Sequence, residues 1–204
     1  MKPIETIMRT APVIPVLVIG DAAYAQPIAQ ALVAGGLRVL EVTLRTAAAL
    51  DVIREMKKVE GAIVGAGTVL NEADLRASLD AGAEFIVSPG LTEPLGKAAV
   101  ASGIPFLPGA ANAGDIMRGL DLGLTHFKFF PAEASGGIAA LKAIAAPFGM
   151  AKFCPTGGIS FATAPDWLAV EPVLCVGGSW VVGKGAPDIA AITAAAIEAA
   201  GLAR

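Results

Sequence analysis

One pattern repeats eight times along this chain: a short β-branched apolar run is followed by a longer alanine-rich stretch of helical character. The runs begin 19 to 26 residues apart, which is the length of one strand, one helix and two short loops. Strands that are apolar throughout are typical of parallel sheets buried on both faces, and their alternation with helices indicates βαβ units. The runs occupy residues 13–18, 38–43, 62–67, 85–89, 104–108, 126–130, 152–156 and 172–178.

Eight such units predict a closed α/β barrel, the (β/α)₈ or TIM barrel, as a single domain over residues 1–204. Barrels of this type are typically about 250 residues long, so the loops of this chain must be short. A doubly wound open sheet is the structural alternative, which the even spacing and the number of units make the weaker one. No linker or low-complexity segment interrupts the pattern.

The composition limits what the protein can be. Of its 204 residues, 55% are hydrophobic and 16% are charged, whereas an average soluble domain has about 25% charged residues. No apolar run approaches the ~20 residues of a membrane-spanning helix, and the first residues carry no signal-peptide core. We therefore expect a cytoplasmic protein without a membrane partner. The formal net charge of −3 and the absence of a basic block argue against a nucleic-acid partner.

Local signals mark helix ends and the state of the cysteines. A predicted helix over residues 22–34 is followed by two glycines, as is typical of a helix C-terminus. Asn71 and Asp188 are predicted to cap the N-termini of two further helices. Cys154 and Cys175 lie within apolar runs and are expected to be buried free thiols.

Lys128 is the polar residue that stands out most among the apolar runs. In the run HFKFF at 126–130, side chains alternate along the strand, so Lys128 shares a face with His126 and Phe130. Burial disfavours the charged form of an amine, and a neutral amine attacks ketones to give a Schiff base. Lys128 is thus a candidate nucleophile. A structural lysine that pairs with a carboxylate is an alternative of equal weight.

Glu41 is the natural partner for Lys128. Residues 39, 41 and 43 share one parity, so Glu41 faces the barrel interior if Val39 and Thr43 do. A carboxylate beside a Schiff-base lysine can shuttle protons as general acid and base. A structural ion pair with Lys128, or with Arg45 just beyond the strand end, is the alternative, and it is compatible with a catalytic role.

Two glycine-rich turns, TGGIS at 156–160 and VGGSW at 176–180, follow the seventh and eighth runs. Backbone amides in such turns can hold a phosphate, and in these barrels the phosphate site is frequently built from these two loops. Plain turn geometry is the alternative. Glycines also end the third and fourth runs, in GAGT at 65–68 and SPG at 88–90, where they would let a ligand approach the backbone.

Metal chemistry has little support in the sequence. His126 is the single histidine, and no cluster of histidine, cysteine and carboxylate has the spacing of a metal site. His126 lies early in its run, away from the catalytic end, and is interpreted as structural. No P-loop or dinucleotide-binding glycine motif is present. Neither a metal nor a cofactor is therefore expected.

The same segments carry a resemblance to a known family. The chain resembles the bacterial 2-keto-3-deoxy-6-phosphogluconate aldolases, which also act as 4-hydroxy-2-oxoglutarate aldolases, over roughly residues 5–200. Matches in this order along a whole chain are hard to obtain by chance. The matching motifs are LVAGG at 32–36, EVTLRT at 41–46, VGAGTVL at 64–70, SPGLT at 88–92, FKFFPAE at 127–133, FCPTGGI at 153–159 and LCVGGSW at 174–180.

The resemblance implies a (β/α)₈ barrel that assembles as a homotrimer and works as a class I aldolase without metal. It implies that Lys128 forms the Schiff base and that Glu41 is the general acid and base. The partner is then a small 2-keto acid substrate, with pyruvate and glyceraldehyde 3-phosphate as products. The substrate-binding residues implied are Arg45, Thr68, Pro89, Phe130 and Thr156, with Arg45 at the substrate carboxylate. The phosphate-binding residues implied are Gly157, Gly158, Gly177, Gly178 and Ser179.

Two features depart from the family pattern. Gly20 stands where relatives often carry a charged residue, and the loop 108–114 lacks the usual Ser or Thr, although Asn112 is polar. Two other functions are alternatives: a phosphate-binding isomerase or epimerase on the same barrel, and a non-catalytic assembly scaffold. Epimerases of this fold usually need a metal cluster, and the intact site motifs argue against a scaffold.

Overall fold

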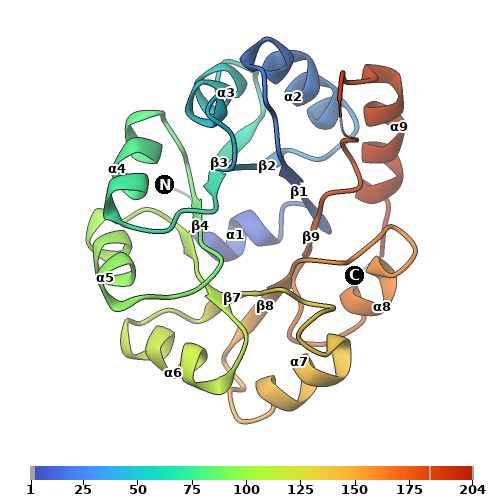
Figure 1. Cartoon of the computed structure of the whole chain (residues 1–204). Coiled ribbons are helices and arrows are strands. Elements are labelled where there is room, and N and C mark those ends of the chain that lie inside the picture. The colour runs from blue at the N-terminus through green and yellow to red at the C-terminus, as the bar shows by residue number, and fades with distance from the viewer. Residues whose placement is uncertain (1–2, 184, 204) are drawn as a thin grey trace.

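The computed structural model describes residues 3–183 and 185–203. The strands are β1 (Val13–Leu17), β2 (Val39–Thr43), β3 (Ile63–Gly67), β4 (Ile86–Val87), β5 (Phe106–Leu107), β6 (Gly109–Ala110), β7 (His126–Phe129), β8 (Lys152–Pro155) and β9 (Val176–Gly178). The helices are α1 (Ile4–Met8), α2 (Ala25–Ala34), α3 (Ala49–Met56), α4 (Glu72–Asp80), α5 (Glu93–Ser102), α6 (Ala113–Asp121), α7 (Gly137–Ala145), α8 (Ala164–Leu168) and α9 (Ile189–Ala200), with a short 3₁₀ helix, η1 (Ala22–Tyr24), before α2. The strands lie at the centre and helices α2 to α9 surround them (Figure 1).

The strands form two parallel sheets, so the fold is of the predicted α/β type. A curled six-stranded sheet has the order β5-β4-β3-β2-β1-β9, and a three-stranded sheet has the order β6-β7-β8. Isolated bridges, Phe153 to Val173 and Thr156 to Gly177, join β8 to the segment that contains β9. Sequential strands are therefore neighbours in space, as the alternation of strands and helices predicts.

Strands form in each of the eight predicted runs, but the fifth run differs from the prediction. Pro108 separates β5, which pairs with β4, from β6, which pairs with β7. Pro108 has no N–H to donate, and the strand changes its partner from β4 to β7 at this residue. The Pro108 carbonyl still accepts a hydrogen bond from the Lys128 N–H at 2.8 Å, which places β7 beside this break.

Successive residues of a strand face two separate apolar clusters. Val39 of β2 and Ile63 of β3 belong to an inner cluster that also contains Cys154. Leu40 and Val64, one position further along the same strands, belong to a larger outer cluster beneath the helices. Because side chains alternate along a strand, both sheet faces are buried, which is why these strands are apolar at nearly every position.

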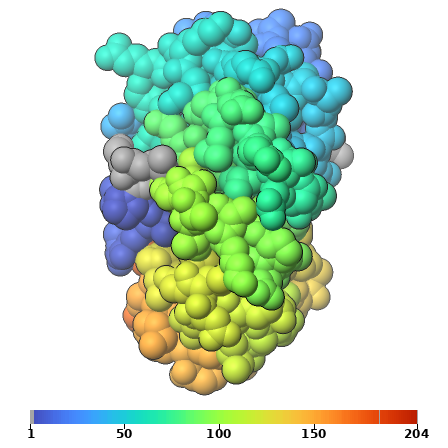
Figure 2. All heavy atoms as spheres, turned by 90° about the vertical axis from the view of Figure 1, so that its left-hand side faces the viewer, coloured from blue at the N-terminus to red at the C-terminus, as the bar shows by residue number. Residues whose placement is uncertain are grey.

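Helix α1 covers one end of the strands, and the sequence pattern gives no signal for it. Ile7 and Met8 are 1% and 0% exposed and pack within the inner cluster. In Figure 2, α1 (dark blue) lies at the left edge of the molecule, on the side that points away from the viewer in Figure 1. Since β1 begins soon after α1, this is the end at which the strands start.

Several local predictions are confirmed. Asn71 accepts a hydrogen bond from the N–H of Asp74 at the start of α4, and Asp188 accepts one from Ala191 at the start of α9. Helix α2 ends at Ala34, directly before the glycine pair. Both cysteines are buried, and neither forms a disulfide. Among the described residues, no helix is long and apolar enough to cross a membrane.

Candidate active site

Lys128 and Glu41 meet in the interior of the molecule. The Lys128 Nζ of β7 donates a hydrogen bond of 3.0 Å to Glu41 Oε1 of β2, although the two residues are 87 positions apart in sequence. They are 5% and 3% exposed. Two charges that leave water in this way lose hydration, and pairing offsets part of that loss. The contact therefore joins the two sheets through a buried ion pair.

Strand alternation explains why both charges point inward. Phe127 and Phe129, the neighbours of Lys128, belong to the outer cluster beneath the helices. Leu40 and Val42 flank Glu41 in the same way. Since neighbouring side chains on a strand lie on opposite faces, the charged residues between them face the interior.

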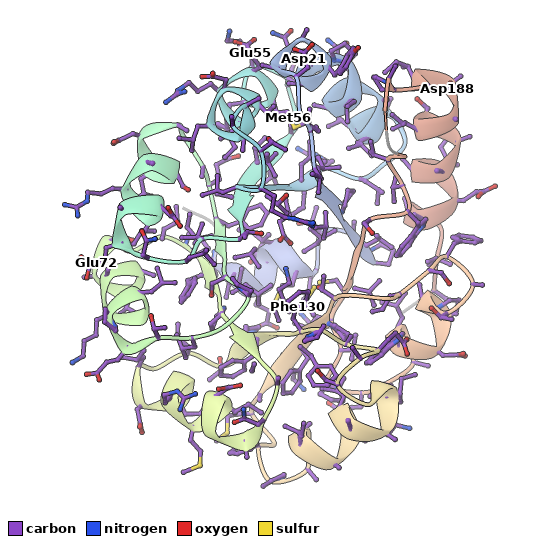
Figure 3. All side chains as sticks on the ribbon, viewed as in Figure 1. Asp21, Glu55, Met56, Glu72, Phe130 and Asp188 are labelled. Carbon is purple, nitrogen blue, oxygen red and sulfur yellow. The ribbon has the colours of Figure 1, made fainter. Side chains whose placement is uncertain are left out.

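Phe130 forms one wall of this site. The Lys128 Nζ lies 5.1 Å from the centroid of the Phe130 ring, within range of a cation–π interaction. Phe130 directly follows β7 and lies close to the centre of the molecule (Figure 3). Its ring supplies an apolar surface on which the carbon chain of a ligand bound to Lys128 could pack.

Thr156 lies at the end of β8, against the end of β9. It is 5% exposed, and its hydroxyl lies 3.4 Å from the Cys154 carbonyl oxygen and 3.9 Å from the Cys154 Sγ. It bridges to Gly177, where a side chain would collide with the Thr156 hydroxyl. Gly177 is therefore glycine because Thr156 occupies the space beside it.

The turn after β3 has an unusual backbone conformation. Thr68 has a φ of 59°, in the left-handed region. A β-branched residue in this region is an outlier, and such strained residues cluster at ligand and active sites. Thr68 is half-buried and directly follows Gly67, the last residue of β3.

The glycine-rich turn after β8 can present backbone amides to a ligand. Gly157 and Gly158 have φ values of 104° and 84°, which favour glycine. Gly158 and Ser179 are not among the backbone N–H donors of the described turns and loops. Such N–H groups, outside the regular ladder, are suited to bind an anion.

Glu133 supports this turn, a role that no sequence feature predicts beyond the place of Glu133 in the FKFFPAE motif. Its N–H donates to the Gly157 carbonyl at 3.0 Å. Its carboxylate accepts a hydrogen bond of 2.9 Å from the indole N–H of Trp167 in α8. A side chain on Gly158 would collide with Glu133. These contacts attach the turn to β7 and α8.

The remaining predicted residues occupy the same end of the strands. Arg45 and Pro89 come shortly after β2 and β4, and Ser179 directly follows β9. Arg45 is exposed and makes no side-chain ion pair or hydrogen bond within residues 3–183 and 185–203. Because the strands are parallel, their carboxyl ends lie on one side of the fold, where barrel enzymes bind substrate.

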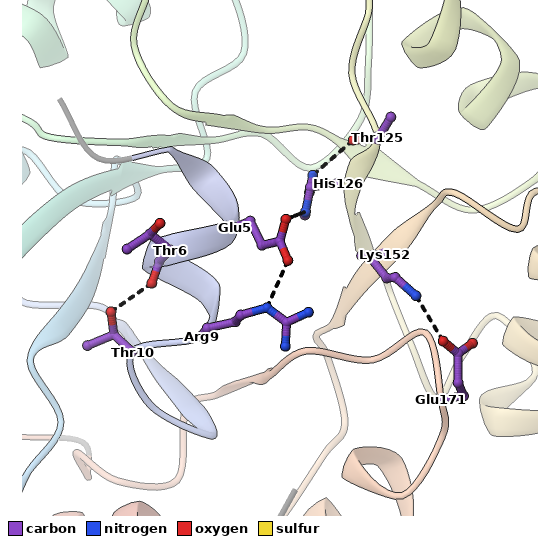
Figure 4. A network of polar contacts seen from close by, with 8 residues as sticks. All are labelled: Glu5, Thr6, Arg9, Thr10, Thr125, His126, Lys152 and Glu171. Carbon is purple, nitrogen blue, oxygen red and sulfur yellow. Dashed lines mark hydrogen bonds and ion pairs between the residues drawn. The ribbon is translucent and has the colours of Figure 1, made fainter.

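The opposite end holds a separate polar network (Figure 4). His126, at the start of β7, lies 3.5 Å from the Glu5 carboxylate of α1 and 3.1 Å from the Thr125 hydroxyl. Burial lowers the pKa of His126, while the Glu5 charge partly opposes this. Arg9 pairs with Glu5, and Lys152 pairs with Glu171. No group of three or more potential metal ligands occurs among the described residues.

The two departures from the family pattern have simple local structures. Asn112 accepts a hydrogen bond from the N–H of Asp115 at 3.1 Å and so caps α6. Gly20 is exposed in the loop after β1, and a Cβ added there would meet nothing within 4 Å. Asn112 bonds to Asp115 and Gly20 has open space around it, so neither residue takes part in the contact between Lys128 and Glu41.

An α/β fold with a carboxylate-paired lysine buried at its centre fits the enzymes that make and break carbon–carbon bonds through a lysine Schiff base. Residues 4–195 match the model of the KDPG and KHG aldolase family, in which KDPG is 2-keto-3-deoxy-6-phosphogluconate. The chain belongs to this family.

Individual relatives support this assignment. The 2-dehydro-3-deoxy-phosphogluconate aldolase of Zymomonas mobilis is 61% identical over 204 residues, which cover 100% of this chain and 98% of the relative. The KHG/KDPG aldolase of Escherichia coli K12 is 58% identical over 179 residues, which cover 87% of this chain and 84% of the relative.

Solved structures agree with the sequence relatives. The KDPG aldolase of Zymomonas mobilis ZM4 with 3-phosphoglycerate has a TM-score of 0.97 and 61% identity, and the match covers 98% of this chain and 96% of that one. The KDPG aldolase of Legionella pneumophila, with pyruvate captured as a covalent carbinolamine, has a TM-score of 0.93 and 42% identity. That match covers 98% of this chain and 99% of the other.

Proposed function

We propose that the protein is a class I aldolase that cleaves 2-keto-3-deoxy-6-phosphogluconate to pyruvate and glyceraldehyde 3-phosphate. We propose the same reaction for 4-hydroxy-2-oxoglutarate, which gives pyruvate and glyoxylate. The observation that carries the proposal is the buried contact of 3.0 Å between Lys128 and Glu41, because it places a potential nucleophile beside a proton acceptor. The named relatives and the carbinolamine of the Legionella enzyme support it.

The first half of the reaction forms the Schiff base. Glu41 accepts a proton from Lys128 across their hydrogen bond, and the neutral amine attacks the C2 carbonyl of the substrate. Glu41 then protonates the carbinolamine hydroxyl, which leaves as water and gives a protonated imine. When the C3–C4 bond breaks, its electron pair can move toward the positively charged imine nitrogen.

The second half breaks the carbon–carbon bond. Glu41 removes the proton of the C4 hydroxyl as the C3–C4 bond breaks and its electron pair moves toward the imine to form an enamine. The aldehyde product leaves. Glu41 returns the proton to C3, and water hydrolyses the imine to release pyruvate and restore the Lys128 amine. One carboxylate can serve each step because it alternates between base and acid.

The other residues bind the two ends of the substrate. We assign the carboxylate to Arg45 and Thr68, and the apolar pyruvyl surface to Pro89 and Phe130. Thr156 is assigned to a substrate hydroxyl. A fixed carboxylate orients the C2 carbonyl toward Lys128, which lowers the entropic part of the activation free energy for the attack.

The phosphate is assigned to the backbone of Gly157, Gly158, Gly177, Gly178 and Ser179. The Gly158 amide in the turn after β8, which is not a donor in the described turns and loops, supports this assignment, as does the 3-phosphoglycerate in the Zymomonas structure. Phosphate binding lies away from the reacting carbons, so its energy can be used to hold the substrate in the reactive position.

We further propose that the strands close into one (β/α)₈ barrel and that three chains form a homotrimer. The ring closure is supported by the short step from β5 to β6 across Pro108 and by the bridge from Thr156 to Gly177. The trimer is an inference from family membership.

Borohydride trapping tests the mechanism. The protein is incubated with pyruvate and sodium borohydride, and the modified residue is mapped by mass spectrometry. We expect a reduced secondary amine on Lys128, no adduct in Lys128→Ala, and an unchanged adduct when Ala replaces Lys97, an exposed lysine paired with Glu93. A folded wild-type protein without an adduct on Lys128 would exclude the Schiff-base mechanism.

A coupled assay distinguishes the other functions. Lactate dehydrogenase reports pyruvate release from each of the two keto-acid substrates. An isomerase, an epimerase or an assembly scaffold would release no pyruvate. The aldolase is expected to do so, and Lys128→Ala is expected to abolish release while its circular dichroism spectrum stays that of the wild type.

A further inference from the structure

Gly67 stands beside Glu41 with no room for a side chain. β2 and β3 are parallel neighbours in which Glu41 pairs with Gly65 and Thr43 pairs with Gly67. A Cβ built on Gly67 would lie 2.7 Å from the Glu41 Cγ and 2.8 Å from its Cδ, and it would overlap Oε1. Approaches below 3.0 Å are essentially absent among real Cβ atoms. The carboxylate therefore occupies the volume that any other residue at 67 would fill.

The backbone at this position does not itself require glycine. Gly67 is absent from the set of described glycines with a positive φ, so an L-residue could adopt its conformation. The restriction comes only from space. This differs from Gly157 and Gly158, whose φ values of 104° and 84° already favour glycine.

The Glu41 side chain has little freedom to retreat from a new methyl group. It is 3% exposed, and close-packed interiors transmit even small changes in volume. The oxygen that the methyl would overlap, Oε1, is the same atom that accepts the 3.0 Å hydrogen bond from Lys128. A shift of the carboxylate therefore changes the contact with Lys128.

We propose that Gly67 is a positioning residue for the reaction: its missing side chain is the space that holds the Glu41 carboxylate against Lys128. Glycine in the GAGT segment thus admits the carboxylate of the neighbouring strand. The catalytic part of this inference rests on the proposed role of Glu41 as general acid and base. The packing part rests on the atom positions alone.

A double-mutant cycle on thermal stability tests the packing part. Gly67→Ala is made in the wild type and in Glu41→Ala, which lacks the Cγ, Cδ and Oε1 atoms that the methyl would meet. We expect Gly67→Ala to lower the melting temperature (Tm) in the wild type and to leave it unchanged or higher in Glu41→Ala. Equal Tm losses in both backgrounds would overturn the inference, since a coupled pair must be non-additive.

Kinetics test the catalytic part. Displacement of a catalytic group by about 1 Å can reduce turnover about 100-fold, so we expect Gly67→Ala to lower kcat by about that factor. The KM for the keto acid is expected to change little, because the substrate-binding residues are not displaced. The pH dependence of kcat is expected to shift, because Glu41 moves relative to Lys128. A kcat and pH profile equal to those of the wild type would overturn the proposal.

Matched variants separate this effect from general destabilisation. Gly65→Ala, on the same strand, would meet the Phe85 ring as its three nearest atoms. It is expected to lower Tm without a shift in the pH profile. Gly149→Ala, in open space between α7 and β8, is expected to change neither the Tm nor the pH profile. A pH shift in Gly65→Ala equal to that in Gly67→Ala would also contradict the proposal.

The outcomes also separate this proposal from the proposed function. If wild-type Lys128 forms no adduct with pyruvate, the aldolase mechanism fails, while the stability cycle still reports whether Gly67 and Glu41 share one space. If trapping succeeds and the stability cycle is additive, the aldolase mechanism stands and the positioning role of Gly67 fails.

Discussion

Lys128 and Glu41 are charged side chains in an interior built almost entirely from apolar atoms. Each would be strongly unfavourable there alone, because an unpaired buried charge loses its hydration without compensation. Their 3.0 Å contact and the Phe130 ring beside Lys128 offset part of this lost hydration. The same closeness gives a direct path for a proton between nitrogen and carboxylate. At the scale of single residues, then, the pair that the fold must stabilise is also the pair that can do chemistry.

His126 is the residue for which the structure predicts a pH effect on stability. Burial lowers its pKa from the ordinary value of 6.5, against the opposing attraction of Glu5. The unfolded chain therefore binds this proton more readily than the folded chain does. The contribution of neutral His126 is fully present above about pH 6.5 and is lost as the pH falls toward the lowered pKa.

Thermal melts between pH 8 and pH 5 check this prediction. We expect the Tm of the wild type to fall more over this range than that of His126→Gln, because the unfolded chain gains the proton of His126 before the folded chain does. Glu5 stays ionised in this range because Arg9 lowers its pKa. Parallel Tm curves for the two proteins would contradict the prediction.

The elements are held at their ends by capping residues that can be compared within one chain. Asn71 accepts a hydrogen bond of 2.9 Å from Asp74 at the start of α4. Thr92, at the equivalent position before α5, makes no side-chain cap hydrogen bond. The two helices pack side by side around the strands (Figure 1), so they offer a matched test of what one cap contributes.

We expect Asn71→Ala to reduce the free energy of unfolding by about 1 kcal/mol, the usual value of an N-cap. Asn112→Ala, at the cap of α6, is expected to behave in the same way, and Thr92→Ala is expected to cost much less. Urea unfolding followed by circular dichroism measures all three. A loss for Thr92→Ala as large as that for Asn71→Ala would show that the side-chain cap bond is not what stabilises these helix starts.

Strand and helix positions could be predicted because their signals are local. Apolar runs, paired glycines and capping residues each act within a few positions of the chain, and they located β1 to β3 and the starts of α4 and α9 closely. Two features could not be predicted from such local signals. Helix α1 has only five residues and is held by its tertiary contacts through Ile7 and Met8. The break between β5 and β6 arises because β5 pairs with β4, whereas β6, on the other side of Pro108, pairs with β7.

At the scale of the whole molecule, two apolar clusters account for the high hydrophobic content. The strands are buried between the inner cluster and the outer one. Some large apolar side chains on the helices still face solvent in the single chain: Val100, Met117 and Ile197 are 46%, 58% and 58% exposed. A proposed homotrimer would give part of this surface a partner.

Light scattering coupled to size-exclusion chromatography measures the assembly. We expect a single species with three times the mass of one chain, unchanged over a tenfold dilution, because obligate interfaces bury large apolar areas and dissociate little. A species with the mass of one chain at every concentration would exclude the trimer and leave the proposed aldolase site unaffected.

The sequence by itself determined the α/β class, the positions of most strands, the capped helix ends and the two charged residues that face one side of their strands. These follow from alternation and from capping, which act between near neighbours. Only the tertiary structure decided that Glu41 and Lys128 touch across 87 positions, that α1 covers the start of the strands, and that Gly67 leaves room for the carboxylate. The physical reason is that contact and free volume depend on which strands become neighbours, and no local pattern specifies them.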